Sequence, residues 1–128
     1  MVVDSTQPRT KWQTISGFIM STSTPIVLLF SYGTLQNRDV QIANFGRELT
    51  GREDTLPSYA LADPVLSDNS QYANIKRSSN PEDAVSGTVF EITEHELAAA
   101  DRYEEDADYH RILVALRSGD HAWVYRRA

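Results

Sequence analysis

Residues 26–35 read Ile-Val-Leu-Leu-Phe-Ser-Tyr-Gly-Thr-Leu, and the rest of the chain is organised around this stretch. Its first four residues form an unbroken apolar run with the length of one buried strand. Gly33 then permits a turn, and Asn37 caps a short helix that ends at Gly46. Backbone N–H groups left without partners at such a turn can bind an anionic or polarised oxygen. The alternative is that Gly33 only makes a turn and Tyr32 only fills the core.

The composition restricts the class of protein. The chain has 128 residues, which is enough for one domain, and a formal net charge of −6, which argues against nucleic acid as a partner. It contains no cysteine, so disulfides, thiolate nucleophiles and cysteine-ligated metals are excluded. No apolar stretch approaches the roughly 20 residues that cross a bilayer, so we expect no membrane partner and a cytoplasmic location.

The first 24 residues differ from the remainder. They are rich in Ser and Thr and lack a clear hydrophobic period, so we expect residues 1–24 to be a flexible N-terminal extension. Residues 25–128 are then expected to form a single domain.

The later segments predict more strands than helices. We expect helices at 38–45 and from Thr93 to about 103, and strands at 47–50, 55–61, 72–76, 84–92, 109–116 and 121–125. Thr93 and Glu96 have the spacing of a capping box, and Gly87 in mid-strand predicts close backbone approach or a bulge. Strands and helices do not alternate, so we expect an α+β domain with a mostly antiparallel sheet, which could curl into a small barrel.

The second predicted helix carries the most informative residue. Leu97, Ala100 and Glu104 lie at i, i+3 and i+7, so they share one face, and a core-facing Leu97 directs Glu104 inward. Burial, the other acids of residues 101–108 and the helix C-terminus are each expected to raise the pKa of Glu104 toward neutrality. A carboxylate with that pKa can both take and return a proton. The alternative is a solvated acidic helix end.

Other chemistry-bearing patterns are weak. The three histidines, His95, His110 and His121, lack metal-ligand spacing. No Gly-x-Ser-x-Gly motif and no phosphate-binding glycine loop is present. We therefore expect no metal and no cofactor.

Two separated patterns resemble the gamma-glutamylcyclotransferase-like family over about residues 26–125. Residues 30–35, Phe-Ser-Tyr-Gly-Thr-Leu, resemble its Tyr-Gly-(Ser/Thr)-Leu/Asn loop. Residues 87–92 (Gly-Thr-Val-Phe-Glu-Ile), 97–104 and 109–114 are similar to its strand, its Leu-Asp-x-x-Glu-Gly helix end and its Tyr-x-Arg strand. The chain departs from the family at Ala100, where Leu is frequent, and at Glu105, where Gly is frequent.

The resemblance implies a small β-barrel with two short flanking helices and a cavity between the first loop and the acidic helix end. By motif position, the catalytic glutamate is Glu104, the substrate-binding loop is Tyr32, Gly33, Thr34 and Leu35, and a cavity tyrosine is Tyr109. The implied activity is metal-independent cyclisation of a gamma-glutamyl amine or peptide to 5-oxoproline, with release of the amine.

The resemblance also indicates a partner, and two alternatives to the enzyme stay open. The expected partner is the small-molecule gamma-glutamyl substrate, and a homodimer stays open. One alternative is a non-catalytic domain that binds a gamma-glutamyl compound or an amino-acid amide. Another is an interaction protein that uses residues 1–24 and an acidic face.

Overall fold

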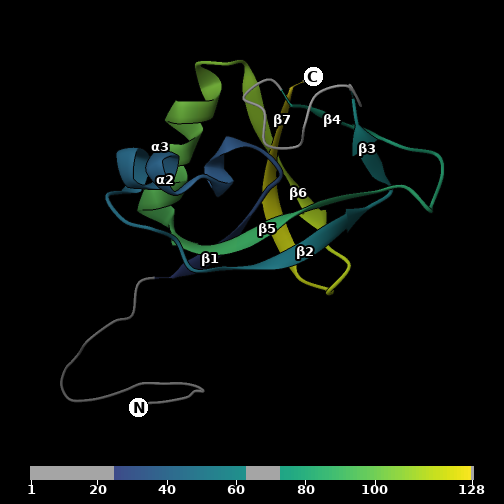
Figure 1. Ribbon diagram of the computed structural model, residues 1–128, viewed down its shortest axis with the longest axis horizontal. Helices are drawn as coiled ribbons and strands as arrows, with labels where there is room; N and C mark the ends of the chain where they lie inside the picture. The colour runs from purple at the N-terminus through teal and green to yellow at the C-terminus, as the bar shows by residue number, and fades with distance from the viewer. Residues whose placement is uncertain (1–24, 63–72, 128) are drawn as a thin grey trace, which may run out of the picture.

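The computed structural model describes residues 25–62 and 73–127, and this part of the chain has an α+β fold (Figure 1). The predicted extension at residues 1–24 lies outside the described residues. The elements in order are β1 Ile26–Ser31, the 3-10 turn η2 Thr34–Gln36, α2 Arg38–Phe45, β2 Gly51–Pro57, β3 Tyr59–Leu61, β4 Ile75–Arg77, β5 Ala84–Thr93, α3 Glu94–Glu105, β6 Tyr109–Ala115 and β7 His121–Arg127.

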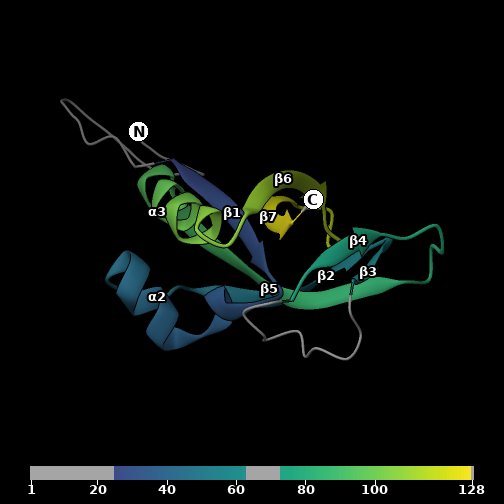
Figure 2. The same cartoon turned by 90° about the horizontal axis from the view of Figure 1, so that it is seen from above.

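One mixed sheet of five strands forms the centre, in the order β2-β5-β1-β7-β6. The central strand β1 pairs antiparallel with β5 and parallel with β7, where Leu29 lies beside Trp123. The strands β3 and β4 form a separate antiparallel pair. Figure 2 shows α2 and α3 together at one end of the molecule and the β3–β4 pair at the other.

The expected barrel is wrong, because the sheet is open. Among the described residues, the edge strands β2 and β6 form no ladder. The β6–β7 turn does approach β2, and the backbone N–H of Arg117 donates to the carbonyl of Thr55 at 2.8 Å. One such bond does not replace the ladder that closes a barrel. We had also expected a mostly antiparallel sheet. The sheet is mixed, because β1 and β7 run parallel.

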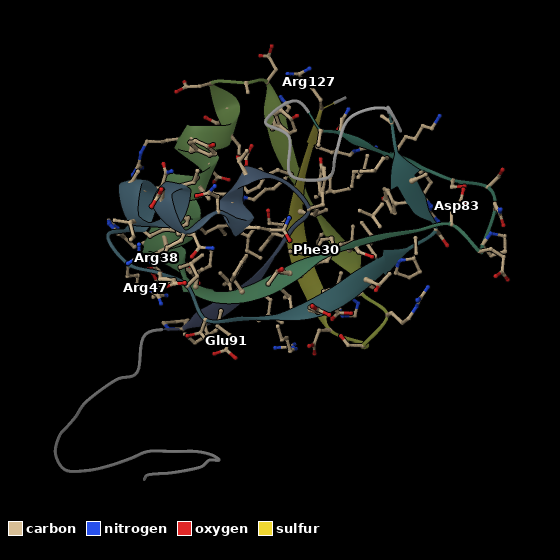
Figure 3. The ribbon with its side chains drawn as sticks, in the orientation of Figure 1. Phe30, Arg38, Arg47, Asp83, Glu91 and Arg127 are labelled. Atoms are coloured by element: carbon tan, nitrogen blue, oxygen red, sulfur yellow. The ribbon has the colours of Figure 1, made fainter. Side chains whose placement is uncertain are left out.

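The core is divided between the two faces of the sheet. Leu29 packs in the cluster on the helix side with Ile92 and Leu97, whereas Phe30 packs on the opposite side with Leu56 and others. Figure 3 shows Phe30 in the middle of the molecule. Successive strand residues point to opposite faces, so a strand covered on both sides needs an uninterrupted apolar sequence. This explains the apolar run at the start of residues 26–35.

Both predicted helices are confirmed with their end signals. The Asn37 side chain accepts from the N–H of Asp39, and Gly46, with φ of 74°, follows the end of α2. The capping box of Thr93 and Glu96 is present at the start of α3. This helix runs to Glu105, two residues past the expected end. No helix in the described part of the chain is long and apolar enough to span a membrane.

The strand predictions were less accurate between the helices. The prediction of a strand at 47–50 is wrong, because this segment bonds to side chains instead of to a neighbouring strand. Arg47 forms an ion pair with Glu96, and the N–H of Leu49 donates to the side chain of Gln41. The strand expected at 55–61 is split into β2 and β3 by Ser58, whose φ is 67°. Of the strand expected at 72–76, only Ile75 and the following residue are in a strand, β4, which ends at Arg77, and position 72 lies outside the described residues. The strands expected at 84–92, 109–116 and 121–125 are β5, β6 and β7.

The close approach expected at Gly87 is confirmed. A Cβ at this position would lie 2.4 Å from the carbonyl oxygen of Ser31. The absence of a side chain therefore lets β5 lie tightly against the end of β1, where the loop at residues 32–35 begins.

Candidate functional site

A small cavity lies between the end of β1 and the last turn of α3. Its volume is about 30 Å³, which is room for roughly two water molecules. All six site residues predicted from the sequence line it, namely Tyr32, Gly33, Thr34, Leu35, Glu104 and Tyr109. The other lining residues are Phe30, Ser31, Ala73 and Tyr125. The fold thus brings together the first loop, the acidic helix end and the strands β6 and β7.

The loop after β1 has its own hydrogen bonds. The Tyr32 hydroxyl donates to the carbonyl of Tyr125 at 2.8 Å, and the N–H of Gly33 donates to the Ser31 hydroxyl at 3.2 Å. Gly33 has a φ of −126°, so the turn does not require the left-handed conformation that favours glycine. Within the described residues, the N–H groups of Thr34 and Leu35 have no acceptor. These two donors can bind an oxygen of a ligand.

Glu104 lies half-buried in the last turn of α3 and faces this cavity. Among the described residues, its carboxyl group has no cation within ion-pair distance. Burial raises its pKa from 4.5 to about 7. The neighbouring acids and the helix end, which we also expected to raise this pKa, are not among its causes. Asp101 is paired with Arg111 at 2.9 Å, and Glu105 is exposed.

Three tyrosine hydroxyls surround the glutamate. Burial raises the pKa of Tyr32, Tyr109 and Tyr125, and the negative charge of Glu104 raises each further. These hydroxyls therefore keep their protons at neutral pH. Tyr109 donates to the carbonyl of Ala73, and Tyr125 donates to Asp101. In the described lining of the cavity, Glu104 is thus the group that exchanges a proton near pH 7.

The sequence analysis missed a buried glutamine that holds the loop in place. The amide nitrogen of Gln41 donates to the carbonyl of Leu35 at 2.8 Å, and its amide oxygen accepts from the N–H of Leu49 at 2.8 Å. Gln41 is 3% exposed. The sequence did contain a signal for this role. Gln41 lies four positions before Phe45, so the two share one side of α2, and a polar residue on the apolar side of a helix indicates a buried hydrogen bond.

A second missed residue joins α3 to the loop. The Tyr103 hydroxyl lies 2.8 Å from the hydroxyl of Thr34. Tyr103 immediately precedes Glu104, and no spacing rule within α3 predicts a contact with a residue from so early in the chain.

The histidines are distributed apart from the site. His95, His110 and His121 are exposed on α3, β6 and β7. Within residues 25–62 and 73–127, no group of three or more His, Asp or Glu side chains is arranged to hold a metal ion.

Residues 29–128 match the family described as gamma-glutamyl cyclotransferase, AIG2-like, so the chain belongs to this family. A comparison with curated proteins finds no match.

Solved structures share the fold. A protein of Arabidopsis thaliana solved in solution is 24% identical, with a TM-score of 0.65 over 83% of this chain and 71% of that one. An uncharacterized human protein is 19% identical, with a TM-score of 0.60 over 80% and 67%. A structure named gamma-glutamyl cyclotransferase is 19% identical, with a TM-score of 0.57 over 81% and 68%. The chain spans about two thirds of the length of these structures.

Proposed function

We propose that the protein is a gamma-glutamylcyclotransferase that converts a gamma-glutamyl amine or peptide into 5-oxoproline and a free amine. One observation carries the proposal. Glu104, whose pKa burial raises to about 7, lines the same cavity as Thr34 and Leu35, whose backbone N–H groups have no acceptor among the described residues. A binding domain gains little from such an acid, because burying a carboxylate is costly. An acid–base catalyst needs a pKa close to the working pH.

The chemistry follows from these groups. The carboxylate of Glu104 takes one proton from the α-ammonium group of the substrate. The freed amine attacks the γ-carbonyl carbon, a carbon–nitrogen bond forms, and the carbonyl oxygen becomes an oxyanion. The N–H groups of Thr34 and Leu35 stabilise this charge. The protonated Glu104 then donates to the leaving nitrogen, and the original amide bond breaks. The extra proton of the ring nitrogen is passed on and leaves with the released amine as its ammonium form.

The nucleophile belongs to the substrate, so the protein supplies no serine, cysteine or cofactor for the attack. Its contribution is to hold the substrate folded, so that the amine lies close to the carbonyl carbon. A gamma-glutamyl group is larger than two water molecules. The cavity therefore has to widen when the substrate enters, by movement of side chains that line it.

The proposal is tested by comparing turnover in variants of two neighbouring glutamates. The protein is incubated with a panel of gamma-glutamyl amines and dipeptides, and 5-oxoproline and released amine are quantified. Glu104→Gln is expected to lower turnover by about 10²–10⁴-fold, the usual effect of losing a general acid–base group. The matched control, Glu105→Gln, removes the adjacent exposed acid and is expected to stay within about twofold of the wild type.

The results separate the proposal from its rivals. Retained turnover in Glu104→Gln contradicts the proposed role of this residue. A larger loss in Glu105→Gln shows that the other glutamate reacts. If the wild type turns over no substrate but binds 5-oxoproline in calorimetry, the protein is a non-catalytic binding domain.

A further inference from the structure

Asp101 joins helix α3 to two strands through one carboxylate oxygen. Its Oδ1 accepts from the Tyr125 hydroxyl at 2.7 Å and from Nε of Arg111 at 2.9 Å. Tyr125 belongs to β7, Arg111 belongs to β6, and Asp101 lies one helical turn before Glu104. Bonds to an ionised carboxylate are shorter and stronger than neutral ones. The turn of α3 that bears Glu104 is therefore attached to the sheet by Asp101.

The partner arginine is itself held from a second direction. The guanidinium carbon of Arg111 lies 4.3 Å from the centre of the Trp123 ring, a distance at which a cation is attracted to the ring face. Arg111 and Trp123 come from the neighbouring strands β6 and β7. Asp101 thus binds a cation whose position the sheet already fixes.

The other partner leads into the cavity. Tyr125 lines the cavity, and its backbone carbonyl accepts from the hydroxyl of Tyr32, which also lines it. The hydroxyl and the carbonyl of Tyr125 are thus both bonded, the first to α3 and the second to the loop after β1. A shift of Asp101 would move Tyr125 and, through it, the cavity wall that faces Glu104.

We propose that Asp101 is a positioning residue, which holds Glu104 in the cavity by fixing the last turn of α3 to Tyr125 and Arg111. The proposal rests on the proposed function for its kinetic consequence, but its structural consequence is independent of turnover. Asp101 does not line the cavity, so it acts on the reaction through its neighbours. The competing explanation is that the Asp101 contacts only stabilise the fold.

A titration separates these explanations. The titratable and charged groups around Glu104 are the hydroxyls of Tyr32, Tyr109 and Tyr125, on which its charge acts, and the guanidinium groups of Arg126 and Arg127, which act on the first of these tyrosines. Asp101→Ala removes the attachment and admits water to the turn. We expect the pKa of Glu104 to fall from about 7 toward its usual value of 4.5. Asp101→Asn keeps an oxygen acceptor for Tyr125 and Arg111, so this conservative variant should retain the wild-type titration. The exposed Asp106 offers the matched control Asp106→Asn.

The experiment follows the side-chain carboxyl carbon of Glu104 by NMR between pH 4 and 9 in each variant, without substrate. The acid limb of kcat/KM is measured in parallel, and we expect it to move with the titration while kcat falls about tenfold in Asp101→Ala. An unchanged titration in folded Asp101→Ala, or an equal shift in Asp106→Asn, overturns the proposal. If Asp101→Ala does not fold, Tyr125→Phe removes one of the two bonds to Asp101. The NMR titration of Glu104 and the acid limb of kcat/KM in this variant then test the proposal in the same way.

The two proposals can fail separately. If the wild type turns over no substrate, the proposed function fails, and the NMR titration still tests the role of Asp101. If the titration is unchanged while Glu104→Gln abolishes turnover, the positioning role fails and the proposed function stands.

Discussion

The hydroxyl oxygen of Tyr103 lies 2.8 Å from the Oγ1 atom of Thr34, and this hydrogen bond joins helix α3 to the loop after β1. Thr34 lines the cavity, and Tyr103 precedes Glu104. The bond connects positions 69 residues apart in the sequence. The backbone N–H of Thr34 takes no part in this bond, so it stays available to a ligand.

Tyr103→Phe removes this bond and leaves the ring in place. We expect the free energy of unfolding to fall by about 1 kcal/mol, the usual net contribution of a hydrogen bond. We also expect kcat/KM to fall about three- to tenfold, because the loop and Glu104 lose their direct connection. Urea unfolding and steady-state kinetics measure the two effects. Tyr59→Phe serves as the control, since the described residues offer its hydroxyl no hydrogen bond. If Tyr103→Phe and Thr34→Val have fully additive effects in a double-mutant cycle, the bond contributes nothing.

Gln41→Leu tests the support of the loop. The substitution leaves the carbonyl of Leu35 and the N–H of Leu49 buried without partners, since both bond to the Gln41 side chain. Each unsatisfied group costs about 1–3 kcal/mol, so we expect the two together to lower the free energy of unfolding by about 2–6 kcal/mol. Asn44→Leu on the same helix removes one half-buried side-chain bond, to the carbonyl of Val40, and should lose less. Equal losses in the two variants would show that these bonds do not decide stability. Thermal and urea unfolding measure the difference.

Local signals in the sequence predicted the parts of the fold that neighbouring residues determine. The caps of α2 and α3, the apolar run of β1 and the face shared by Leu97, Ala100 and Glu104 are patterns of this kind. Together with the resemblance to a family, such signals predicted six residues, all of which line one cavity.

Contacts between distant segments were not predictable in this way. The parallel pairing of β1 with β7, which makes the sheet mixed, depends on the whole path of the chain, and so does the absence of a ladder between the described edge strands β2 and β6, which leaves the sheet open. The bond between Thr34 and Tyr103 and the two bonds of Gln41 depend on how packed elements meet. The pKa of Glu104 was expected to rise for three reasons, and burial, which depends on tertiary packing, is the cause.

Gly87→Ala tests the close approach of β5 to β1. The new Cβ would lie 2.4 Å from the carbonyl oxygen of Ser31, and a backbone atom cannot rotate away. We expect a loss of about 1–3 kcal/mol in the free energy of unfolding, as is usual for overpacking, together with weaker binding of 5-oxoproline, because Ser31 lines the cavity. Gly119→Ala is the control: its Cβ would meet open space, and its φ of 99° costs stability without touching the cavity. If calorimetry finds binding unchanged in Gly87→Ala, this approach does not shape the site.

The raised pKa of Glu104 predicts a dependence of stability on pH with a definite sign. In the folded state the pKa is about 7, whereas the unfolded chain has the usual 4.5. Between these values the folded protein retains a proton that the unfolded chain has lost, so the free energy of unfolding decreases as the pH rises. The cost is absent below pH 4.5 and complete above pH 7, and at 1.36 kcal/mol per pKa unit it amounts to about 3 kcal/mol.

Glu104→Gln removes this titration, so the variant should be more stable than the wild type at pH 8 and nearly equal to it at pH 4. Urea unfolding over this range measures the difference, and the exposed Glu105→Gln should show the pH dependence of the wild type. A constant difference between Glu104→Gln and the wild type at every pH would mean that Glu104 is ionised normally in the folded protein. In that case the buried acid on which the proposed catalysis depends does not exist, because a carboxylate with a usual pKa is a weak base toward the α-ammonium proton of the substrate.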